Sequence, residues 1–287
     1  MTTGSSSLRN AFFGDRHDVR RTSYVRGELL TTFTQAIVRA PSRNFADGLT
    51  TADLGRPDVE RTMNQHEAYC RALERCGLTL TRLAADPQYP DSTFVEDTAV
   101  IAPGCAVLTR PGAASREGEV VAIRSAVERH FPSPHFIKMP GTVDGGDVCE
   151  AGRHFFIGVS LRTNQEGARQ LACLLVAADF TCTIIDIRRT PGILHLKSGV
   201  VALDDRCLVA IRALADHEAF SGYDVIRVNE GEEYAANCVR VNAHVLVALG
   251  FPQLERSLVA RGFELVPLDM SEFRKMDGGL SCLSLRF

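Results

Sequence analysis

The 287-residue sequence predicts an α/β fold in which five modules, each made of strands and a helix, surround a central axis. Short strand-like segments alternate with helical segments, and polar residues recur near strand ends at intervals of roughly 40–50 residues. No Ser- or Pro-rich linker divides the chain. We therefore expect one domain over 34–287, preceded by an N-terminal arm over 1–33 whose residues 2–7 are disordered.

Strand and helix signals follow one another along the chain. Segments with the composition of strands are 34–40, 78–83, 93–102, 105–110, 147–160, 181–187, 196–203, 206–211 and 283–287. The pair 93–102 and 105–110 is typical of a hairpin. Helical segments are 57–77, 115–131, 163–179 and 252–262. Ser115 is expected to cap the second helix, and Thr163 or Asn164 the third.

Five polar landmarks accompany this alternation. They are Glu96-Asp97, the segment from Asp144 to Asp147, His195, Asn237 and Cys282. If each landmark belongs to one module, the modules bring five distant segments together at the axis. The end of the chain would then complete the fifth module, which explains why Cys282 stands only five residues from the C-terminus, behind a Gly-Gly pair.

Composition excludes several classes of protein. Apolar residues make up 45 % of the chain, charged residues 23 %, and the net charge is −3. These values are typical of a globular protein and predict no nucleic-acid or membrane partner. The N-terminus lacks the apolar core of a signal peptide. The sequence does not indicate whether the protein is a monomer or a homodimer.

The cysteines point to a reducing compartment. Their number, nine, is odd, and no C-x-x-C motif occurs, so neither a disulfide framework nor a zinc ribbon is indicated. Apolar surroundings, such as those of Cys173 and Cys182, predict buried thiols. We expect a cytoplasmic protein.

Cys282 and His195 could form a nucleophile and its acid–base partner. The glycines before Cys282 allow close backbone approach. Each residue also has a simpler interpretation when it is considered alone, Cys282 as a buried thiol and His195 as a core histidine. The Asp144–Asp147 segment, DGGD, likewise fits a tight turn.

Charged residues elsewhere suggest a ligand with two unlike ends. Asp91, Glu96 and Asp97 place three carboxylates within seven residues, which requires a cation between them if they face inward. No histidine is nearby and the spacing matches no metal loop, so a guanidinium suits them better than a metal ion. Arg110 and Arg162 follow strands and could bind a carboxylate. Arginine and its derivatives have both ends.

Seven segments together resemble the dimethylarginine dimethylaminohydrolases, of the guanidino-group-modifying pentein superfamily. The segments are FVED, TRPGA-SR, DGGDV, FFIGVSLRTNQEGA, LHLKSG, AANC-R-N and DGGLSCLS. They occur in the family's order and spacing and cover roughly 34–287. The resemblance implies a five-bladed α/β propeller of ββαβ modules, hydrolysis of methylated arginine to citrulline and an alkylamine, and no metal or organic cofactor.

The resemblance also implies roles for individual residues. Cys282 would be the nucleophile, His195 the general acid and base, and Asp144 the carboxylate that orients the histidine and the guanidinium. The implied substrate contacts are Leu49, Asp91, Glu96, Asp97, Arg110, Arg162 and Met276, with the two arginines holding the α-carboxylate. The thiolate would attack the guanidinium carbon to give a covalent thiouronium, which His195 and water would then resolve.

Three alternatives stay open at this point. An arginine deiminase uses similar residue types, although that family typically carries a helical insertion for which the landmark spacing leaves no room. An amidinotransferase is disfavoured by size. A non-catalytic protein that binds an arginine analogue is disfavoured by the complete set of Cys282, His195 and Asp144.

Overall fold

The structure is a computed structural model that describes residues 32–287, so the predicted arm over 1–33 lies almost entirely outside the described residues. The strands are β1 (Gln35–Arg39), β2 (Thr79–Leu83), β3 (Ala99–Ala102), β4 (Cys105–Leu108), β5 (His135–Phe136), β6 (Val148–Ala151), β7 (His154–Val159), β8 (Thr181–Asp186), β9 (Val200–Ala202), β10 (Cys207–Ile211), β11 (Asp224–Val228), β12 (Val239–Val241), β13 (His244–Ala248), β14 (Glu264–Leu268) and β15 (Leu285–Arg286). The α-helices are α1 (Val59–Arg75), α2 (Glu119–Glu128), α3 (Gln165–Ala177), α4 (Arg212–Ala215), α5 (Pro252–Ala260) and α6 (Ser271–Arg274).

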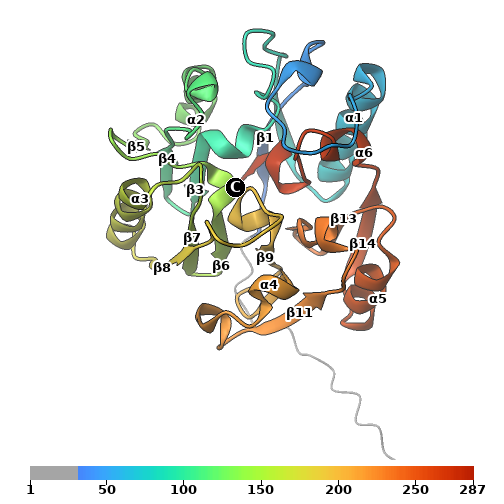
Figure 1. The fold of residues 1–287 in the computed structure, drawn as a ribbon. Helices are drawn as coiled ribbons and strands as arrows, with labels where there is room; N and C mark the ends of the chain where they lie inside the picture. The colour runs from blue at the N-terminus through green and yellow to red at the C-terminus, as the bar shows by residue number, and fades with distance from the viewer. Residues whose placement is uncertain (1–31) are drawn as a thin grey trace, which may run out of the picture.

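Five three-stranded sheets surround a central axis (Figure 1). In each sheet an inner strand pairs antiparallel with a middle strand, and an outer strand pairs parallel with the middle one, as in the sheet β6-β7-β8. A helix connects the middle strand to the outer strand, because parallel neighbours need a crossover connection. This repeat confirms the predicted five-bladed α/β propeller of ββαβ modules.

The first blade is completed by the last strand of the chain. β15 pairs antiparallel with β1, with Ile37 opposite Leu285, and β1 pairs parallel with β2. The C-terminus therefore lies at the centre of the ring (Figure 1). The structure thus confirms the prediction that the chain end is fixed inside a module.

A short 3-10 turn precedes every inner strand. These turns are η2 (Val95–Thr98), η4 (Gly145–Asp147), η5 (Leu196–Ser198), η7 (Glu233–Ala236) and η8 (Ser281–Leu283). The predicted strands over 93–102 and 196–203 are therefore too long, since their first residues belong to η2 and η5. All five polar landmarks lie in these turns or next to them, at one end of the inner strands.

Of the two predicted helix caps, the cap of α3 is confirmed and the cap of α2 is wrong. Asn164 caps α3, because its side chain accepts a hydrogen bond from the backbone N–H of Gly167 at 2.8 Å. Ser115 does not cap α2. It lies in η3 (Ala114–Arg116), and α2 begins only at Glu119, after Gly118. The strands β5 and β11 to β14 are not among the predicted segments, because they are short or lack clear alternation.

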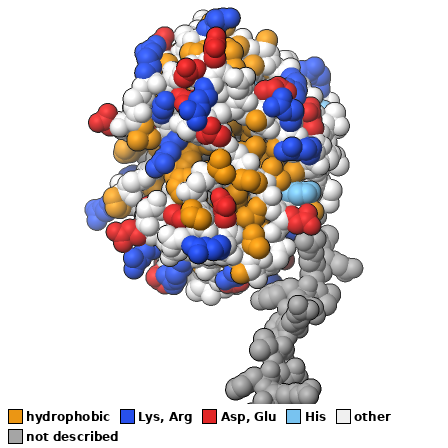
Figure 2. All heavy atoms as spheres, turned by 90° about the vertical axis from the view of Figure 1, so that its right-hand side faces the viewer, with side chains coloured by type: hydrophobic (Ala, Val, Ile, Leu, Met, Phe, Trp, Pro, Cys, Tyr) orange, Lys and Arg blue, Asp and Glu red, His pale blue; other side chains and the backbone are white. Residues whose placement is uncertain are grey.

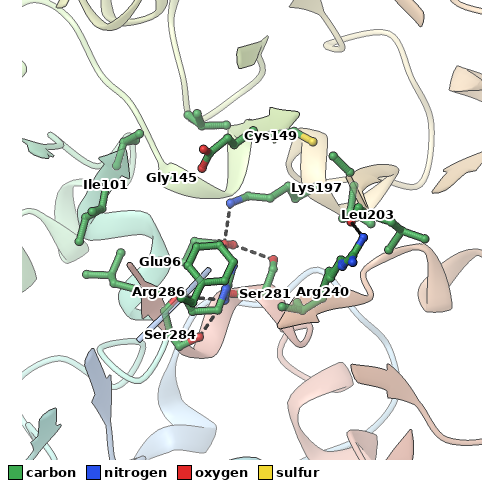
Figure 3. A pocket seen from close by; sticks show the side chains of 18 of the residues that line it. Glu96, Ile101, Gly145, Cys149, Lys197, Leu203, Arg240, Ser281, Ser284 and Arg286 are labelled. Atoms are coloured by element: carbon green, nitrogen blue, oxygen red, sulfur yellow. Dashed lines mark hydrogen bonds and ion pairs between the residues drawn. The ribbon is translucent and has the colours of Figure 1, made fainter. Parts of the chain in front are cut away.

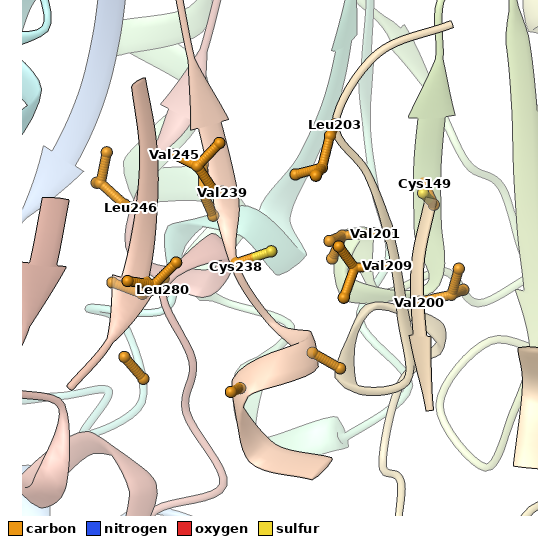
Figure 4. Packing of buried hydrophobic residues seen from close by; sticks show 14 of the residues in the cluster. Cys149, Val200, Val201, Leu203, Val209, Cys238, Val239, Val245, Leu246 and Leu280 are labelled. Atoms are coloured by element: carbon orange, nitrogen blue, oxygen red, sulfur yellow. The ribbon is translucent and has the colours of Figure 1, made fainter. Parts of the chain in front are cut away.

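Apolar side chains of the inner and middle strands fill the space between the blades. Figure 4 shows Val201, Val209, Cys238 and Val239 packed between neighbouring blades. Most of the cysteines are buried, as predicted, but Cys173 is exposed and Cys182 only half-buried. The error arises because apolar residues stand on both faces of α3: Leu171 and Leu175 are buried, whereas Cys173 and Val176 are exposed.

The described surface agrees with the small net charge. Figure 2 shows the face at the right of Figure 1, where Lys and Arg are interspersed with Asp and Glu around hydrophobic side chains. This face carries no broad basic area of the kind that binds nucleic acid. Among residues 32–287, no helix has both the length and the hydropathy required to cross a bilayer.

Candidate active site

The 3-10 turns bring residues from distant blades to one small pocket at the centre of the ring. Its lining comprises Leu49, Asp91, Phe94, Asp97, Arg116, Arg162, Leu194, His195, Met276, Asp277, Gly278 and Cys282. The cavity measures only about 30 Å³. Most of the sequence-predicted site residues are therefore neighbours, although they span more than 230 residues of the chain from Leu49 to Cys282.

His195 and Asp144 form a buried pair. The histidine Nε2 lies 3.0 Å from Asp144 Oδ2, and the other carboxylate oxygen accepts the backbone N–H of Gly112 at 2.8 Å. Burial alone would lower the pKa of His195. Asp97, Asp147 and Asp144 outweigh burial and raise that pKa to about 9, so the imidazole is protonated at neutral pH.

Asp97 is held between a backbone amide and an arginine. Its Oδ1 accepts the N–H of Gly146 at 2.9 Å, and its Oδ2 accepts Arg116 Nη1 at 2.6 Å. Burial opposes ionisation, but His195 and Arg116 lower the pKa of Asp97 to about 2. The carboxylate is therefore ionised throughout the neutral range. A Cβ on Gly146 would lie 2.9 Å from the His195 ring, so only glycine permits this approach.

Cys282 lies in η8 and is half-buried. The backbone N–H of Gly279 donates to its Sγ at 3.4 Å. Burial, followed by the negative charges of Glu96 and Asp97, raises the pKa of the thiol to about 12. The empty pocket thus holds a neutral thiol, and a cation placed between Cys282 and Asp97 would favour the thiolate.

Leu49, which lines the pocket, belongs to a loop over 48–51 that two aspartates hold in place. Both carboxylate oxygens of Asp91 accept the backbone N–H of Leu49 at 3.1 Å, and Asp277 Oδ2 accepts the N–H of Thr51 at 2.5 Å. A Cβ on Gly48 would lie 2.3 Å from Asp91 Oδ1. The loop is therefore tied to both Asp91 and the segment that carries Met276 and Cys282.

The arginines differ from the sequence analysis. Arg162 lines the pocket, and its buried Nη1 has no hydrogen-bond partner, its nearest acid being Asp144 at 4.0 Å. Arg110 does not line the pocket; its guanidinium bonds Glu117 at 2.6 Å. Arg116, which the sequence analysis missed, lines it instead. Glu119, three residues further along the chain, accepts a hydrogen bond from Arg116 Nε at 3.0 Å. An acid at this spacing is the one feature of the sequence that could have indicated a paired, buried arginine.

The side chain of Glu96 also lies elsewhere. It points into a larger cavity on the other side of η2, where its Oε1 accepts Lys197 Nζ at 2.5 Å and its Oε2 accepts Ser281 Oγ at 2.7 Å (Figure 3). Any contact between Glu96 and a ligand in the smaller pocket would therefore use its backbone. This Lys197–Glu96–Ser281 link forms a wall between the two cavities.

Asp97, Asp144 and His195 place one ligand atom each within 4.8 Å of one another, a spacing that could hold a metal ion. These groups are already engaged, however, because Arg116 binds Asp97 and His195 binds Asp144. The same carboxylates are suited to an organic cation that donates hydrogen bonds. The absence of a cofactor stays a prediction.

Comparisons with known proteins identify the family. No family model matches the chain. An N(G),N(G)-dimethylarginine dimethylaminohydrolase of Pseudomonas aeruginosa is 41 % identical over 256 residues, which cover 89 % of this chain and 100 % of the relative. A protein of the same name from Streptomyces coelicolor is 33 % identical over 255 residues, covering 88 % and 96 %. This chain belongs to the dimethylarginine dimethylaminohydrolase family.

Solved structures agree with this assignment. The Pseudomonas aeruginosa enzyme, crystallised as a cysteine-to-serine mutant with citrulline, superimposes with a TM-score of 0.86 at 40 % identity and covers 89 % of this chain. The N-terminal domain of a cyanobacterial arginine dihydrolase has a TM-score of 0.79 at 19 % identity, which shows a shared fold. The propeller is thus the pentein fold that the sequence predicted.

Proposed function

We propose that this protein hydrolyses the guanidinium C–N bond of Nω-methylated arginine, giving citrulline and an alkylamine, with Cys282 as the nucleophile. The observation that carries the proposal is the meeting of Cys282, His195 and the buried carboxylate of Asp97 in one small pocket, with Asp144 bonded to His195. Family membership supports it, since the curated relatives are named for this reaction.

The charges around the pocket match an amino acid with a cationic end. Asp97 supplies negative charge beside the thiol, where a guanidinium would lie, and Asp144 supplies it beside His195. Arg162 offers its unpartnered Nη1 to the α-carboxylate. Arg116 adds positive charge, but its hydrogen bonds already go to neighbouring acids and backbone oxygens. Leu49 and Met276 would contact the substrate through backbone groups, and Asp91 through its carboxylate or the loop that it holds.

The reaction would proceed in two stages. The Cys282 thiolate attacks the guanidinium carbon, forming the C–S bond, and protonated His195 gives its proton to the departing alkylamine as the C–N bond breaks. A covalent thiouronium remains on Cys282. Neutral His195 then takes a proton from water, and the hydroxide attacks the same carbon. The C–S bond breaks to give the thiolate and protonated citrulline, which loses its extra proton to solvent, where the released alkylamine takes one up.

The two perturbed pKa values support these assignments. A histidine whose pKa is about 9 is protonated when the substrate arrives, as a general acid must be. Burial and the nearby carboxylates raise the pKa of Cys282 to about 12, and the cationic substrate offsets them in the complex. The thiolate therefore forms chiefly when a guanidinium is bound, which limits side reactions of the free thiol.

Further features belong to the same proposal. Residues 34–287 would act as one catalytic domain, without metal or organic cofactor. The free cysteines of the described residues support a reducing compartment, which we take to be the cytoplasm. The partner is a small molecule, and the protein acts as a monomer or homodimer.

Product analysis tests the proposal directly. Arginine, monomethylarginine and asymmetric dimethylarginine are incubated separately with the protein, and citrulline is measured together with ammonia, methylamine and dimethylamine. We expect citrulline with an equal amount of alkylamine from the methylated substrates. Efficient turnover of arginine alone would indicate a deiminase. A protein that makes no citrulline, and does not concentrate a haloacetamidine label on Cys282, would be a non-catalytic binder.

A further inference from the structure

Asn237 is the polar landmark of the sequence to which the proposed reaction gives no direct role. It follows η7, the turn that precedes β12, and it is buried, with only 7 % of its surface exposed. Its side chain does not line the active-site pocket. A buried amide is costly unless its donors and its acceptor are bonded, so the partners of Asn237 indicate what it does.

The amide of Asn237 joins two other blades of the propeller. Its Nδ2 donates to the backbone carbonyl of Lys197 at 2.9 Å and to Ser281 Oγ at 3.0 Å, and its Oδ1 accepts the backbone N–H of Ser281 at 2.9 Å. Lys197 lies in η5, which precedes β9, and Ser281 lies in η8, which precedes β15. One side chain from the blade of β12 thus binds the turns of both these blades.

Each of the two bonded turns carries a reacting group. The backbone carbonyl of His195 accepts the N–H of Ser198 at 3.0 Å, which fixes the histidine to η5 and therefore to the Lys197 carbonyl. Ser281 directly precedes Cys282 in η8. The hydrogen bonds of Asn237 to main-chain atoms therefore set the position of the turn that carries the imidazole relative to the turn that carries the thiol.

Asn237 also supports the backbone group that contacts the thiol. A Cβ on Gly279 would lie 2.5 Å from Asn237 Cγ, so the glycine backbone lies directly against the amide. The N–H of this glycine donates to Cys282 Sγ at 3.4 Å. Asn237 therefore supports the nucleophile at two points, through Ser281 and through Gly279.

The wall joins the same two turns, but less directly. Lys197 Nζ binds Glu96 Oε1, and Glu96 Oε2 accepts Ser281 Oγ, so this link runs through three side chains (Figure 3). One of them is the flexible four-carbon stem of a lysine. Asn237 instead spans the turns with a single short side chain that binds a main-chain atom on each side. Of the two links, only that of Asn237 fixes main-chain atoms of both turns.

We propose that Asn237 is a positioning residue, which holds the His195 imidazole and the Cys282 thiol at the separation that the reaction needs. The inference rests on the proposed function, in which the thiolate attacks the guanidinium carbon and the imidazole protonates a nitrogen bonded to that carbon. Both groups must therefore reach neighbouring atoms of one substrate. Misplacing a reacting group by about 1 Å can lower a rate about 10²-fold.

Asn237→Ala removes all three hydrogen bonds and tests this role. We expect kcat for dimethylarginine to fall about 10²-fold, and KM to change less than about threefold, because the residues that line the pocket are unchanged. Alkylation of Cys282 by a haloacetamidine should slow by less than kcat does, since the expulsion of halide needs no proton from His195.

Asn237→Asp is a second variant that preserves the size of the side chain. It keeps the acceptor for the N–H of Ser281 but sets a carboxylate oxygen against the Lys197 carbonyl. We expect its kcat to fall at least about tenfold. Each protein is compared at the pH of its own maximum rate, because the added charge also raises the pKa of the nearby thiol.

The matched control is Asn242→Ala, at the other end of β12. Asn242 Nδ2 donates to the carbonyls of Phe33 and Cys76 at 3.0 Å and 2.8 Å, and its Oδ1 accepts the N–H of Phe33 at 2.9 Å. Its φ of 54° makes alanine strained there as well. Urea unfolding should show a loss of stability at least as large as in Asn237→Ala, whereas kcat should stay within about twofold of the wild type.

Three results would refute the positioning role. They are a wild-type kcat in folded Asn237→Ala, an equal loss of kcat in Asn242→Ala, and a raised KM with an unchanged kcat, which would place Asn237 among the substrate contacts. If Asn237→Ala does not fold, Asn237→Asp decides by the same criteria. The proposed function fails only if the wild type itself forms no citrulline, so the wild-type measurement distinguishes the two failures.

Discussion

The two cavities on either side of the wall differ in how their charges are satisfied. In front, Asp144 is bonded to His195 and Asp97 to Arg116, and the group left without a partner is a cation, Arg162. Behind, the group left without a partner is an anion, Glu150. The front pocket is also lined by Leu49 of the loop over 48–51, whereas hairpin-turn residues such as Gly152 and Asn242 line the rear cavity.

This difference arises from single steps along the backbone. In η2 and η8 neighbouring side chains point to opposite sides of the wall, so Glu96 faces the rear and Asp97 the front. One short turn therefore builds both cavities, and the charge of each affects the other. The side chain of Glu96 is part of the wall and lines the rear cavity, yet its charge contributes to the raised pKa of Cys282 in front. The five predictions below test this division of roles.

The largest effect is expected for Cys282→Ser, which should abolish citrulline formation. Serine is a far weaker nucleophile than a thiolate when no strong base activates it. The substitution is nearly isosteric, so the thermal midpoint should change little. Turnover close to the wild-type rate, measured as citrulline released, would rule out Cys282 as the nucleophile.

His195→Ala should lower kcat by about 10²- to 10⁴-fold, the range for loss of general acid–base catalysis. In the wild type, kcat/KM should fall as pH rises through about 9, because the free protein then loses the proton that His195 gives to the leaving amine. Initial rates at saturating substrate give kcat, and rates at low substrate concentration give the pH profile of kcat/KM. If the variant loses only a few-fold in kcat, another residue supplies the proton.

Lys197→Met should reduce the free energy of unfolding by about 3–5 kcal/mol, because it leaves Glu96 buried without its main partner. Urea denaturation measures this change. The control is the double variant Lys197→Met/Glu96→Gln, which removes both charges and should recover much of the loss. A single variant as stable as the wild type would show that Arg286 alone neutralises Glu96.

These predictions rely on residues that the sequence identifies unequally well. Asp144, His195 and Cys282 stand in motifs with a repeated spacing, and each lies in or beside a 3-10 turn, so the sequence locates them. The spacing cannot show which way adjacent side chains point, and it therefore groups Glu96 with Asp97. Adjacent side chains of a strand would also point to opposite faces, so the strand expected at this place did not justify grouping the two carboxylates, and in the 3-10 turn η2 they line different cavities.

The arginines show the same limit of pattern analysis. Arg110 pairs through its backbone with Val143, and its side chain turns outward to Glu117. Arg116 is directed inward by η3, where its guanidinium donates to the carboxylates of Asp97 and Glu119 and to two backbone carbonyls. The sequence offers two arginines six residues apart in one loop. Only the path of that loop in space decides which of them reaches the pocket.

Arg162→Ala should lower kcat/KM for dimethylarginine by about 10- to 150-fold, because the substrate carboxylate loses a charge-assisted hydrogen bond of roughly 1.5–3 kcal/mol. The decarboxylated analogue, which lacks that carboxylate, should be a poor substrate of the wild type and should lose little in the variant. The measurement is kcat/KM for both compounds in both proteins. Equal efficiency of the two compounds in the wild type would show that Arg162 binds no carboxylate.

The smallest effect is a change in pH dependence caused by Glu150→Gln. Burial raises the pKa of Glu150 from 4.5 to about 7, so the folded protein holds this proton more tightly than the unfolded chain does. Its contribution to stability is therefore present below about pH 4.5 and is lost as pH rises through 7. Glutamine does not titrate, so the free energy of unfolding of the variant should fall by about 1–2 kcal/mol less than that of the wild type between pH 5 and pH 8.

The buried acids Asp147 and Glu119 also have raised pKa values, but they titrate in both proteins, so their contributions to the pH dependence cancel in the comparison. Urea unfolding at the two pH values measures the difference, and parallel pH profiles for both proteins would mean that burial of Glu150 costs little when the carboxyl is ionised.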